Sequence, residues 1–215
     1  LKYVSSEDIH VYSIDEMFLD LTPYLKYYNK SAYDISKAIL NDIYKTTKLP
    51  AVCGIGENMF LAKVALDILA KHKPDGIAYL DQDGLKEKIW SHKPITDIWG
   101  IGRGIAKRLE KLKVTSLGEL AICPLDKLEK EFGIVGKELL EHAYGIERCT
   151  VQEARSYLPS SKSFGHGQVL FEDYNYEDMY TVLLETVDEV ACELVTRKLN
   201  CGLIALGIGY SKDIG

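Results

Sequence analysis

Two neighbouring carboxylates, Asp15 and Glu16, are the side chains of this sequence whose types and spacing could do chemistry. They stand between two short β-rich runs, 9–12 and 17–21, which predict a hairpin or a sharp strand junction. Adjacent side chains of a regular strand point to opposite faces, so two of them converge only at a turn or a strand end. Paired hard oxygens select Mg²⁺ or Mn²⁺. The sequence therefore predicts a site for a divalent cation at this turn.

Apolar residues flank the acidic pair on both sides, namely Val11, Ile14, Met17 and Phe18. Two like charges with such neighbours repel each other and are costly to hold near a core unless a cation neutralises them. Taken alone, an Asp-Glu pair on a turn is more often simply solvated. Both interpretations stay open at this point.

A glycine-rich turn at 99–106 reads Trp-Gly-Ile-Gly-Arg-Gly-Ile-Ala. A Gly-x-Gly turn that opens a helix lets backbone N–H groups approach a phosphate at the positive end of the helix dipole. The following helix and its exit carry five basic side chains against a single Glu110. We expect a clamp on the phosphate backbone of DNA, and the alternative is a helical hairpin with a solvated basic face. The candidate DNA-binding residues are Gly100, Gly102, Arg103, Gly104, Lys107 and Arg108.

Three lysines on and just after the helix that follows Asn58, namely Lys63, Lys71 and Lys73, fall in the same layer as the carboxylates. Lysines on a helix are usually solvated. Beside a metal site, one of them could instead bind a triphosphate as a point charge. The five histidines show no spacing typical of metal ligands.

The elements that must position these residues follow from the apolar periodicity. Ser31 caps a predicted helix with apolar residues at every fourth position, and 51–55 reads as a buried strand that Gly54 and Gly56 end. Asn58 caps the next helix, and 77–80 is another strand. This order of strands and helices predicts an α/β layer.

After residue 81 the pattern changes to short helices only, and a small helical domain is predicted. The predicted helices are 85–90, 103–112, 117–121, 125–132 and 135–144. Residues 153–162 are polar and read as a linker. Beyond them we expect a strand at 163–170, a long helix at 177–199 and a strand at 203–210.

Composition limits the classes of protein that remain. The chain has 215 residues and 47% hydrophobic residues, enough for one large domain or two to three small ones. No apolar run approaches the ~20 residues that a membrane helix needs. Five scattered cysteines without a C-x-x-C pair indicate neither a disulfide framework nor a zinc site, so a reducing, cytoplasmic setting is predicted. The net charge of -6 argues against a histone-like sheath for nucleic acid and permits a local basic patch.

Taken in order, these motifs resemble those of the Y-family translesion DNA polymerases of the UmuC and DinB type, over essentially the whole chain. Residues 12–21, around Ser-Ile-Asp-Glu, resemble the family's palm motif, and 54–65 followed by Lys73-Pro-Asp-Gly resembles its next palm stretch. Residues 99–106 resemble the helix-hairpin-helix of the thumb, and 161–164 resemble the start of the little finger.

The resemblance implies an α/β palm remnant at 1–81, without the N-terminal strand and the fingers. It further implies a small all-α thumb with a helix-hairpin-helix at 82–154, and a linker with a partial, truncated α+β little finger at 155–215. The third metal-binding aspartate, the aromatic that excludes ribonucleotides, and the Tyr and Arg of the fingers do not precede Leu1. We therefore expect an internal fragment that is inactive by itself.

The implied reaction is template-directed DNA synthesis past damaged bases, by transfer of a nucleotide from a dNTP to a primer 3′ hydroxyl. In it, Asp15 would be a ligand of two Mg²⁺ ions and Glu16 a ligand or the base, so that both are the catalytic and metal-binding candidates. Lys73 would contact the triphosphate, with Lys71 possible because the segment is slightly longer than usual. The implied partners are primer-template DNA, dNTP and a sliding clamp bound through a region outside this chain, with no membrane.

Two other interpretations stay open. The chain could be a non-catalytic DNA-binding helix-hairpin-helix module whose acidic residues are vestigial. A nucleotidyl cyclase-like palm is disfavoured, because such a domain has no use for the glycine-rich hairpin.

Overall fold

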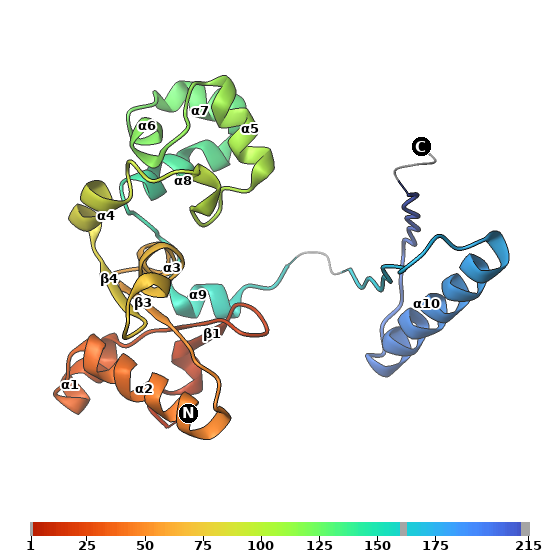
Figure 1. Cartoon of the computed structure of the whole chain (residues 1–215), viewed down its shortest axis with the longest axis horizontal. Helices are drawn as coiled ribbons and strands as arrows, with labels where there is room; N and C mark the ends of the chain where they lie inside the picture. The colour runs from red at the N-terminus through yellow and green to blue at the C-terminus, as the bar shows by residue number, and fades with distance from the viewer. Residues whose placement is uncertain (1, 160–162, 212–215) are drawn as a thin grey trace. The chain divides into compact units, whose positions relative to one another are not determined.

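The computed structural model describes residues 2–159 and 163–211, and the chain divides into two compact units, Leu1–Tyr157 and Leu158–Gly215 (Figure 1). Each unit is described by itself. The expected Ser161-Lys162 start of the little finger lies outside the described residues.

The acidic pair lies on a β-hairpin, as predicted. Strands β1 (Ile9–Val11) and β2 (Met17–Leu19) pair antiparallel, with Val11 opposite Met17 at the end of the hairpin next to the turn. A short 3-10 helix, η1 (Ser6–Asp8), precedes β1. The turn that joins the strands carries both carboxylates.

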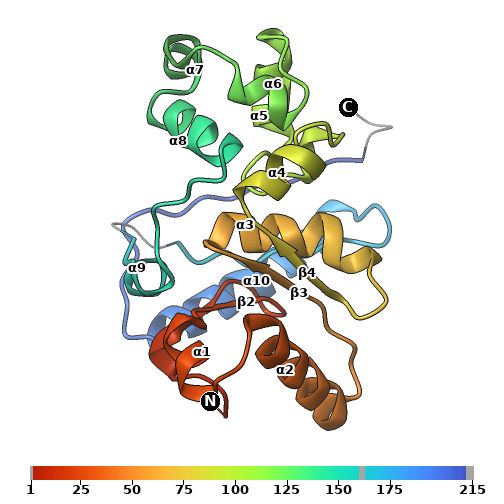
Figure 2. The same ribbon diagram turned by 90° about the vertical axis from the view of Figure 1, so that its left-hand side faces the viewer.

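A second sheet consists of two parallel strands, β3 (Cys53–Gly56) and β4 (Ile77–Leu80). Helix α2 (Ala32–Thr47) and helix α3 (Met59–Val64) lie on either side of it (Figure 2). The predicted caps are confirmed, because the Ser31 side chain accepts from the Asp34 N–H and the Asn58 side chain accepts from the Leu61 N–H.

Gly56 is the last residue of β3, as predicted, whereas Gly54 lies inside the strand. They are needed because α3 packs directly on the strand backbone. A Cβ on Gly54 would lie 2.0 Å from the Ala62 carbonyl oxygen, and one on Gly56 would lie 2.5 Å from the Ala62 nitrogen. Only glycine lets the helix come this close.

The chain beyond α3 continues as a π-helical turn, η2 (Ala65–Leu69), and a 3-10 turn, η3 (Ala70–His72), before β4. A further helix, α1 (Thr22–Tyr28), was not predicted. Its sequence Thr-Pro-Tyr-Leu-Lys-Tyr-Tyr is rich in aromatics that favour strands, and Pro23 in its first turn is the main local signal for a helix.

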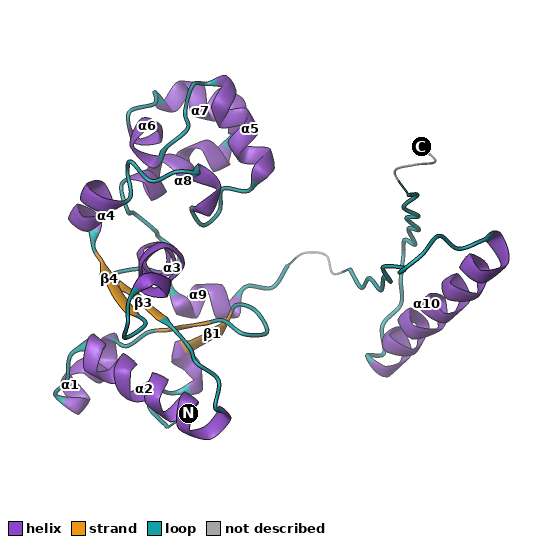
Figure 3. Cartoon of the chain, in the orientation of Figure 1, coloured by secondary structure: helices purple, strands orange, loops and turns teal. Residues whose placement is uncertain are grey.

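The rest of the first unit is helical, as predicted (Figure 3). The elements are α4 (Gln82–Lys88), the 3-10 turn η4 (Ile95–Asp97), α5 (Arg103–Lys111), α6 (Leu117–Ala121), α7 (Leu125–Phe132) and α8 (Ile134–Ala143). One buried hydrophobic cluster runs from α3 and β4 into these helices, with Phe60, Leu85, Leu109, Leu120 and Leu128 fully buried. The helices are therefore fixed to α3 and β4 by a shared core.

The predicted linker is partly helical. Helix α9 (Val151–Ser156) begins with a complete capping box between Thr150 and Glu153 and packs against β1. Gln152 donates from Nε2 to Asp8 (3.0 Å) and to Asp20 (3.2 Å), which ties α9 to both strands at the end of the hairpin opposite the turn. The polar composition that suggested a linker is that of a short surface helix.

In the second unit the long predicted helix is confirmed as α10 (Tyr176–Thr196). The strands expected at 163–170 and 203–210 are absent from the described residues, where both segments lack regular structure. An alternating sequence forms a strand only where a neighbouring strand pairs with its backbone groups. None of the helices described is both long and apolar enough to cross a membrane, and all five cysteines are free thiols.

Candidate active site

The hairpin turn is held by its backbone. The N–H groups of Tyr12 and Ser13 both donate to the Glu16 carbonyl oxygen, at 3.0 and 3.1 Å. The Ser13 hydroxyl donates to Asp15 Oδ1 at 2.8 Å. These bonds fix the turn without using either oxygen of the Glu16 carboxylate.

The apolar neighbours of the acidic pair are largely exposed, except Phe18, which is half-buried. Ile14 is fully exposed, Val11 and Met17 are more than half exposed, and the Asp15 side chain is exposed as well. The apolar side chains Val11, Ile14 and Met17 lie on the solvent-exposed surface of the hairpin. Asp15 therefore lies in solvent, whereas Glu16 is half-buried.

Glu16 instead has a partner that the sequence did not reveal. Lys63 Nζ donates to Glu16 Oε1 at 2.8 Å and to Oε2 at 2.9 Å. The Lys63 side chain is 10% exposed and that of Glu16 is 32% exposed. The pair is therefore largely screened from water, and it ties the hairpin turn to α3.

Lys63 belongs to a longer row of alternating charges. Asp67, in η2, lies 3.1 Å from Lys63 Nζ and 3.0 Å from Lys71 Nζ. Burial tends to lower the pKa of Lys63, but the hydrogen bonds to Glu16 and Asp67 outweigh it and leave the pKa raised. The row Glu16, Lys63, Asp67 and Lys71 therefore connects the metal candidate with one of the triphosphate candidates.

Lys73, the other triphosphate candidate, is exposed just before Pro74. The loop that carries it is anchored to α2, because the Tyr33 hydroxyl donates to Asp75 Oδ2 at 2.7 Å. That bond, with a backbone bond from Ile77, holds the pKa of Asp75 below its usual value. Lys73 thus extends into solvent from a fixed loop.

The two carboxylates of the turn are ligands of the type that magnesium takes. Mg²⁺ keeps several waters and is commonly bound through one or two carboxylates together with substrate phosphates. Asp15 and Glu16 supply two such carboxylates from adjacent positions of one turn. Among the described residues, no group of three or more His, Cys, Asp or Glu side chains is arranged to hold a metal by itself.

The glycine-rich turn leads into α5 as predicted. Gly100 has φ +86°, a conformation that favours glycine, and Gly102 is the N-cap of α5 without a side-chain capping bond. A Cβ built on Gly100, Gly102 or Gly104 would meet nothing within 4 Å. In contrast to Gly54, these glycines leave an open surface above the first turn of α5.

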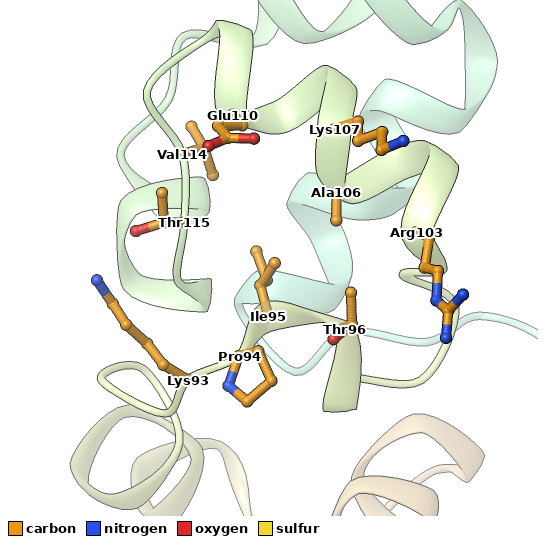
Figure 4. A pocket seen from close by; sticks show the side chains of 10 residues that line it. All are labelled: Lys93, Pro94, Ile95, Thr96, Arg103, Ala106, Lys107, Glu110, Val114 and Thr115. Atoms are coloured by element: carbon orange, nitrogen blue, oxygen red, sulfur yellow. The ribbon is translucent and has the colours of Figure 1, made fainter.

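The basic side chains of α5 divide between two directions. Arg103 and Lys107 line an open groove of about 670 Å³, together with Lys93 on its other rim (Figure 4). Arg108 is engaged elsewhere, since its Nε donates to Glu131 Oε1 at 2.8 Å and its guanidinium lies 4.4 Å from the centre of the Phe132 ring. Arg108 is therefore held by α7, whereas Arg103 and Lys107 line the groove on α5.

Trp99 links the two candidate sites, a role that sequence reasoning missed. Its indole Nε1–H donates to the Tyr12 hydroxyl at 2.9 Å, and its ring lies 5.8 Å from that of Phe18. On its other side it stacks at 6.4 Å on His142, which stacks in turn at 4.3 Å on Phe60. This aromatic cluster holds the glycine-rich turn against the hairpin. The sequence signal for this packing role was a bulky aromatic, Trp99, directly before the first glycine of the turn.

Comparisons with known proteins show which family the chain is similar to. The model of the impB/mucB/samB family matches residues 1–67. The DNA repair protein homolog YobH of Bacillus subtilis is 38% identical over 180 residues, which are 83% of this chain and 82% of YobH. DNA polymerase IV 2 of the same organism is 34% identical over 205 residues, 94% of this chain and 48% of that protein.

Solved structures give the same result. DinB from Sulfolobus solfataricus matches with a TM-score of 0.54 and 28% identity, over 67% of this chain and 41% of DinB. The chain spans about half the length of most of the curated relatives that it matches, but 82% of the length of YobH.

Proposed function

The chain belongs to the impB/mucB/samB family, the UmuC/DinB group of the Y-family DNA polymerases, and we propose that it supplies the metal-binding hairpin and a DNA-holding turn for DNA synthesis past damaged bases. The reaction would transfer a nucleotide from a dNTP to the 3′ hydroxyl of a primer. The observation that carries the proposal is the position of the Asp15-Glu16 turn beside the lysines of α3 and η3.

We assign roles to the residues of this site as follows. Asp15 and Glu16 would hold Mg²⁺, and Lys73 with Lys71 would bind the triphosphate of the dNTP as point charges. A bound pair of Mg²⁺ ions supplies activation of the attacking hydroxyl and stabilisation of the leaving pyrophosphate. Asp15 is exposed and Glu16 is half-buried, so as metal ligands the Asp15 side chain would move more freely than the Glu16 side chain.

The glycine-rich turn would hold the duplex through its backbone. The open surface over Gly100, Gly102 and Gly104 lets N–H groups at the start of α5 approach a phosphate, and Arg103 and Lys107 add charge beside it. Such contacts position DNA without reading its sequence. In this scheme residues 1–81 form the palm, 82–154 the thumb and 155–215 a linker with part of the little finger.

Gly104→Ala separates the stability of the chain from its binding of DNA. Alanine is the better helix former, and its Cβ meets nothing within 4 Å, so we expect the free energy of unfolding to rise by up to about 1 kcal/mol. The same methyl group obstructs a phosphate at this surface, and we expect the affinity for duplex DNA to fall at least threefold. Urea unfolding and fluorescence anisotropy with a labelled primer-template measure the two quantities. Unchanged DNA affinity in the stabilised variant would move the DNA contact away from this turn.

Primer extension tests the proposed reaction. The natural protein in full length is expected to extend a primer opposite an abasic site with Mg²⁺, and to stop when EDTA removes the ion. The 215 residues alone are expected to bind the primer-template without extending it, because the two-ion site that the family resemblance implies uses a third aspartate. Extension by the full-length protein in EDTA would refute the metal assignment.

A second candidate function rests on one contact. Since Lys63 neutralises Glu16 within the chain, the acidic turn is stable without a metal ion, as a non-catalytic DNA-binding module would require. Full-length protein that binds the primer-template normally and never extends it would favour this module over the polymerase.

A further inference from the structure

Lys63 is an almost completely buried cation whose partners surround it. Its Nζ donates to both carboxylate oxygens of Glu16, at 2.8 and 2.9 Å, and lies 3.1 Å from Asp67. The ring of Tyr12 covers a further side, with its centre 5.8 Å away. A buried lysine is held this way only when its charge is paired.

The backbone that carries Lys63 is fixed. Asn58 caps α3 and also donates from Nδ2 to the Gly145 carbonyl oxygen at 2.8 Å, while Phe60, Leu61 and Val64 are fully buried. Helix α3 additionally lies in contact with the backbone of β3 at Gly54. The ammonium group can therefore move away from Glu16 only by rotation of the Lys63 side chain. Asp67 and the ring of Tyr12 limit the space for that rotation.

We infer that Lys63 is an internal counter-ion of Glu16 that a divalent cation has to share or displace, so that it weakens the affinity of the hairpin for that cation. This inference rests on the proposed function, in which Glu16 is a metal ligand. A carboxylate has about four lone-pair sites, so an ion approaches Glu16 on the side away from Lys63 and meets a like charge across the carboxylate. Lys63 is thus a positioning residue, which acts on the ion through Glu16.

The size of the effect follows from Coulomb's law. The repulsion between the ammonium group and a divalent ion is twice that between two unit charges at the same separation, and it is not fully screened even by bulk water. Removal of the Lys63 charge is therefore expected to tighten binding by about tenfold or more. A purely structural role for Lys63 would give the opposite sign, since loosening the hairpin would weaken the site.

The test is a titration of the protein with Mn²⁺, followed by NMR of ¹³C-methyl-labelled methionine. Met17 directly follows Glu16 and is one of three methionines, so paramagnetic broadening of its methyl signal reports an ion at the turn. We expect Lys63→Gln to reach half-broadening at about one tenth of the Mn²⁺ concentration that the wild type needs.

Two variants control for charge in general. Lys63→Arg keeps the charge and is expected to stay within threefold of the wild type. Lys86→Gln removes a lysine of α4 that lies 3.6 Å from Asp83 and is not part of the charge row, and it is also expected to stay within threefold. Asp67→Asn leaves Lys63 with Glu16 as its remaining carboxylate partner, and weaker Mn²⁺ binding is expected.

The outcomes separate this inference from the proposed function. Equal or weaker binding in a folded Lys63→Gln protein, or tightening of the same size in Lys86→Gln, overturns the inference and leaves the metal site standing. No saturable broadening of Met17 in the wild type overturns both. Should Lys63→Gln fail to fold, Asp67→Asn decides, because unchanged or tighter binding in that variant contradicts the counter-ion.

Discussion

Replacing Asp15 by Asn in the full-length protein is expected to lower the rate of nucleotide addition by at least about 10³-fold. The change keeps the shape of the side chain and removes the negative charge that would hold Mg²⁺. Asn can still accept the hydrogen bond from the Ser13 hydroxyl, so the turn is expected to keep its conformation. Single-turnover primer extension at saturating Mg²⁺ measures the rate.

The matched control for this prediction is Asp126→Asn, because Asp126 is an exposed aspartate on α7. It is expected to leave the rate within twofold of the wild type. Both variants are expected to bind the primer-template with unchanged affinity in the absence of dNTP, since the DNA contacts are assigned to the turn before α5. An Asp15→Asn protein that keeps more than a tenth of the wild-type rate would remove Asp15 from the metal site.

The largest expected effect on stability is that of Gly54→Ala. The new Cβ would lie 2.0 Å from the Ala62 carbonyl oxygen, 2.4 Å from the Leu66 nitrogen and 2.8 Å from the Leu66 Cβ. The two nearest of these atoms belong to the backbone, so no side-chain rotation relieves the clash and α3 has to move off β3. We expect a loss of at least about 3 kcal/mol in the free energy of unfolding, measured by urea denaturation.

The same substitution at an open position serves as the comparison. Gly104→Ala adds an identical methyl group where nothing lies within 4 Å, and it is expected to raise the free energy of unfolding. A Gly54→Ala protein as stable as the wild type would mean that α3 and β3 tolerate a wider separation than the structure has.

Features with a local cause could be predicted from the sequence. The caps at Ser31 and Asn58 depend on side chains that bond to the backbone three residues away, and the helices around α5 to α8 follow from apolar periodicity. The hairpin followed from two short β-rich runs around polar residues. Each of these signals lies within a few residues of the element that it predicts.

Features that depend on distant contacts could not be predicted. Lys63 and Glu16 are 47 residues apart, and nothing in either segment indicates that they meet. Gly54 looks like part of a strand end, and the contact with α3 that requires glycine there is visible only in the fold. In the same way, alternation at 163–170 and 203–210 suggests strands, although a strand also needs a neighbour to pair with.

The position of Trp99 gives the protein a built-in optical probe. The sequence has only two tryptophans, Trp90 and Trp99, and the indole of Trp99 is hydrogen-bonded to Tyr12 of the hairpin. In a Trp90→Phe background, the fluorescence of the single remaining indole would report whether the acidic turn stays in place. Its emission wavelength and quenching by acrylamide could then be followed while duplex or ions are added, with no dye attached.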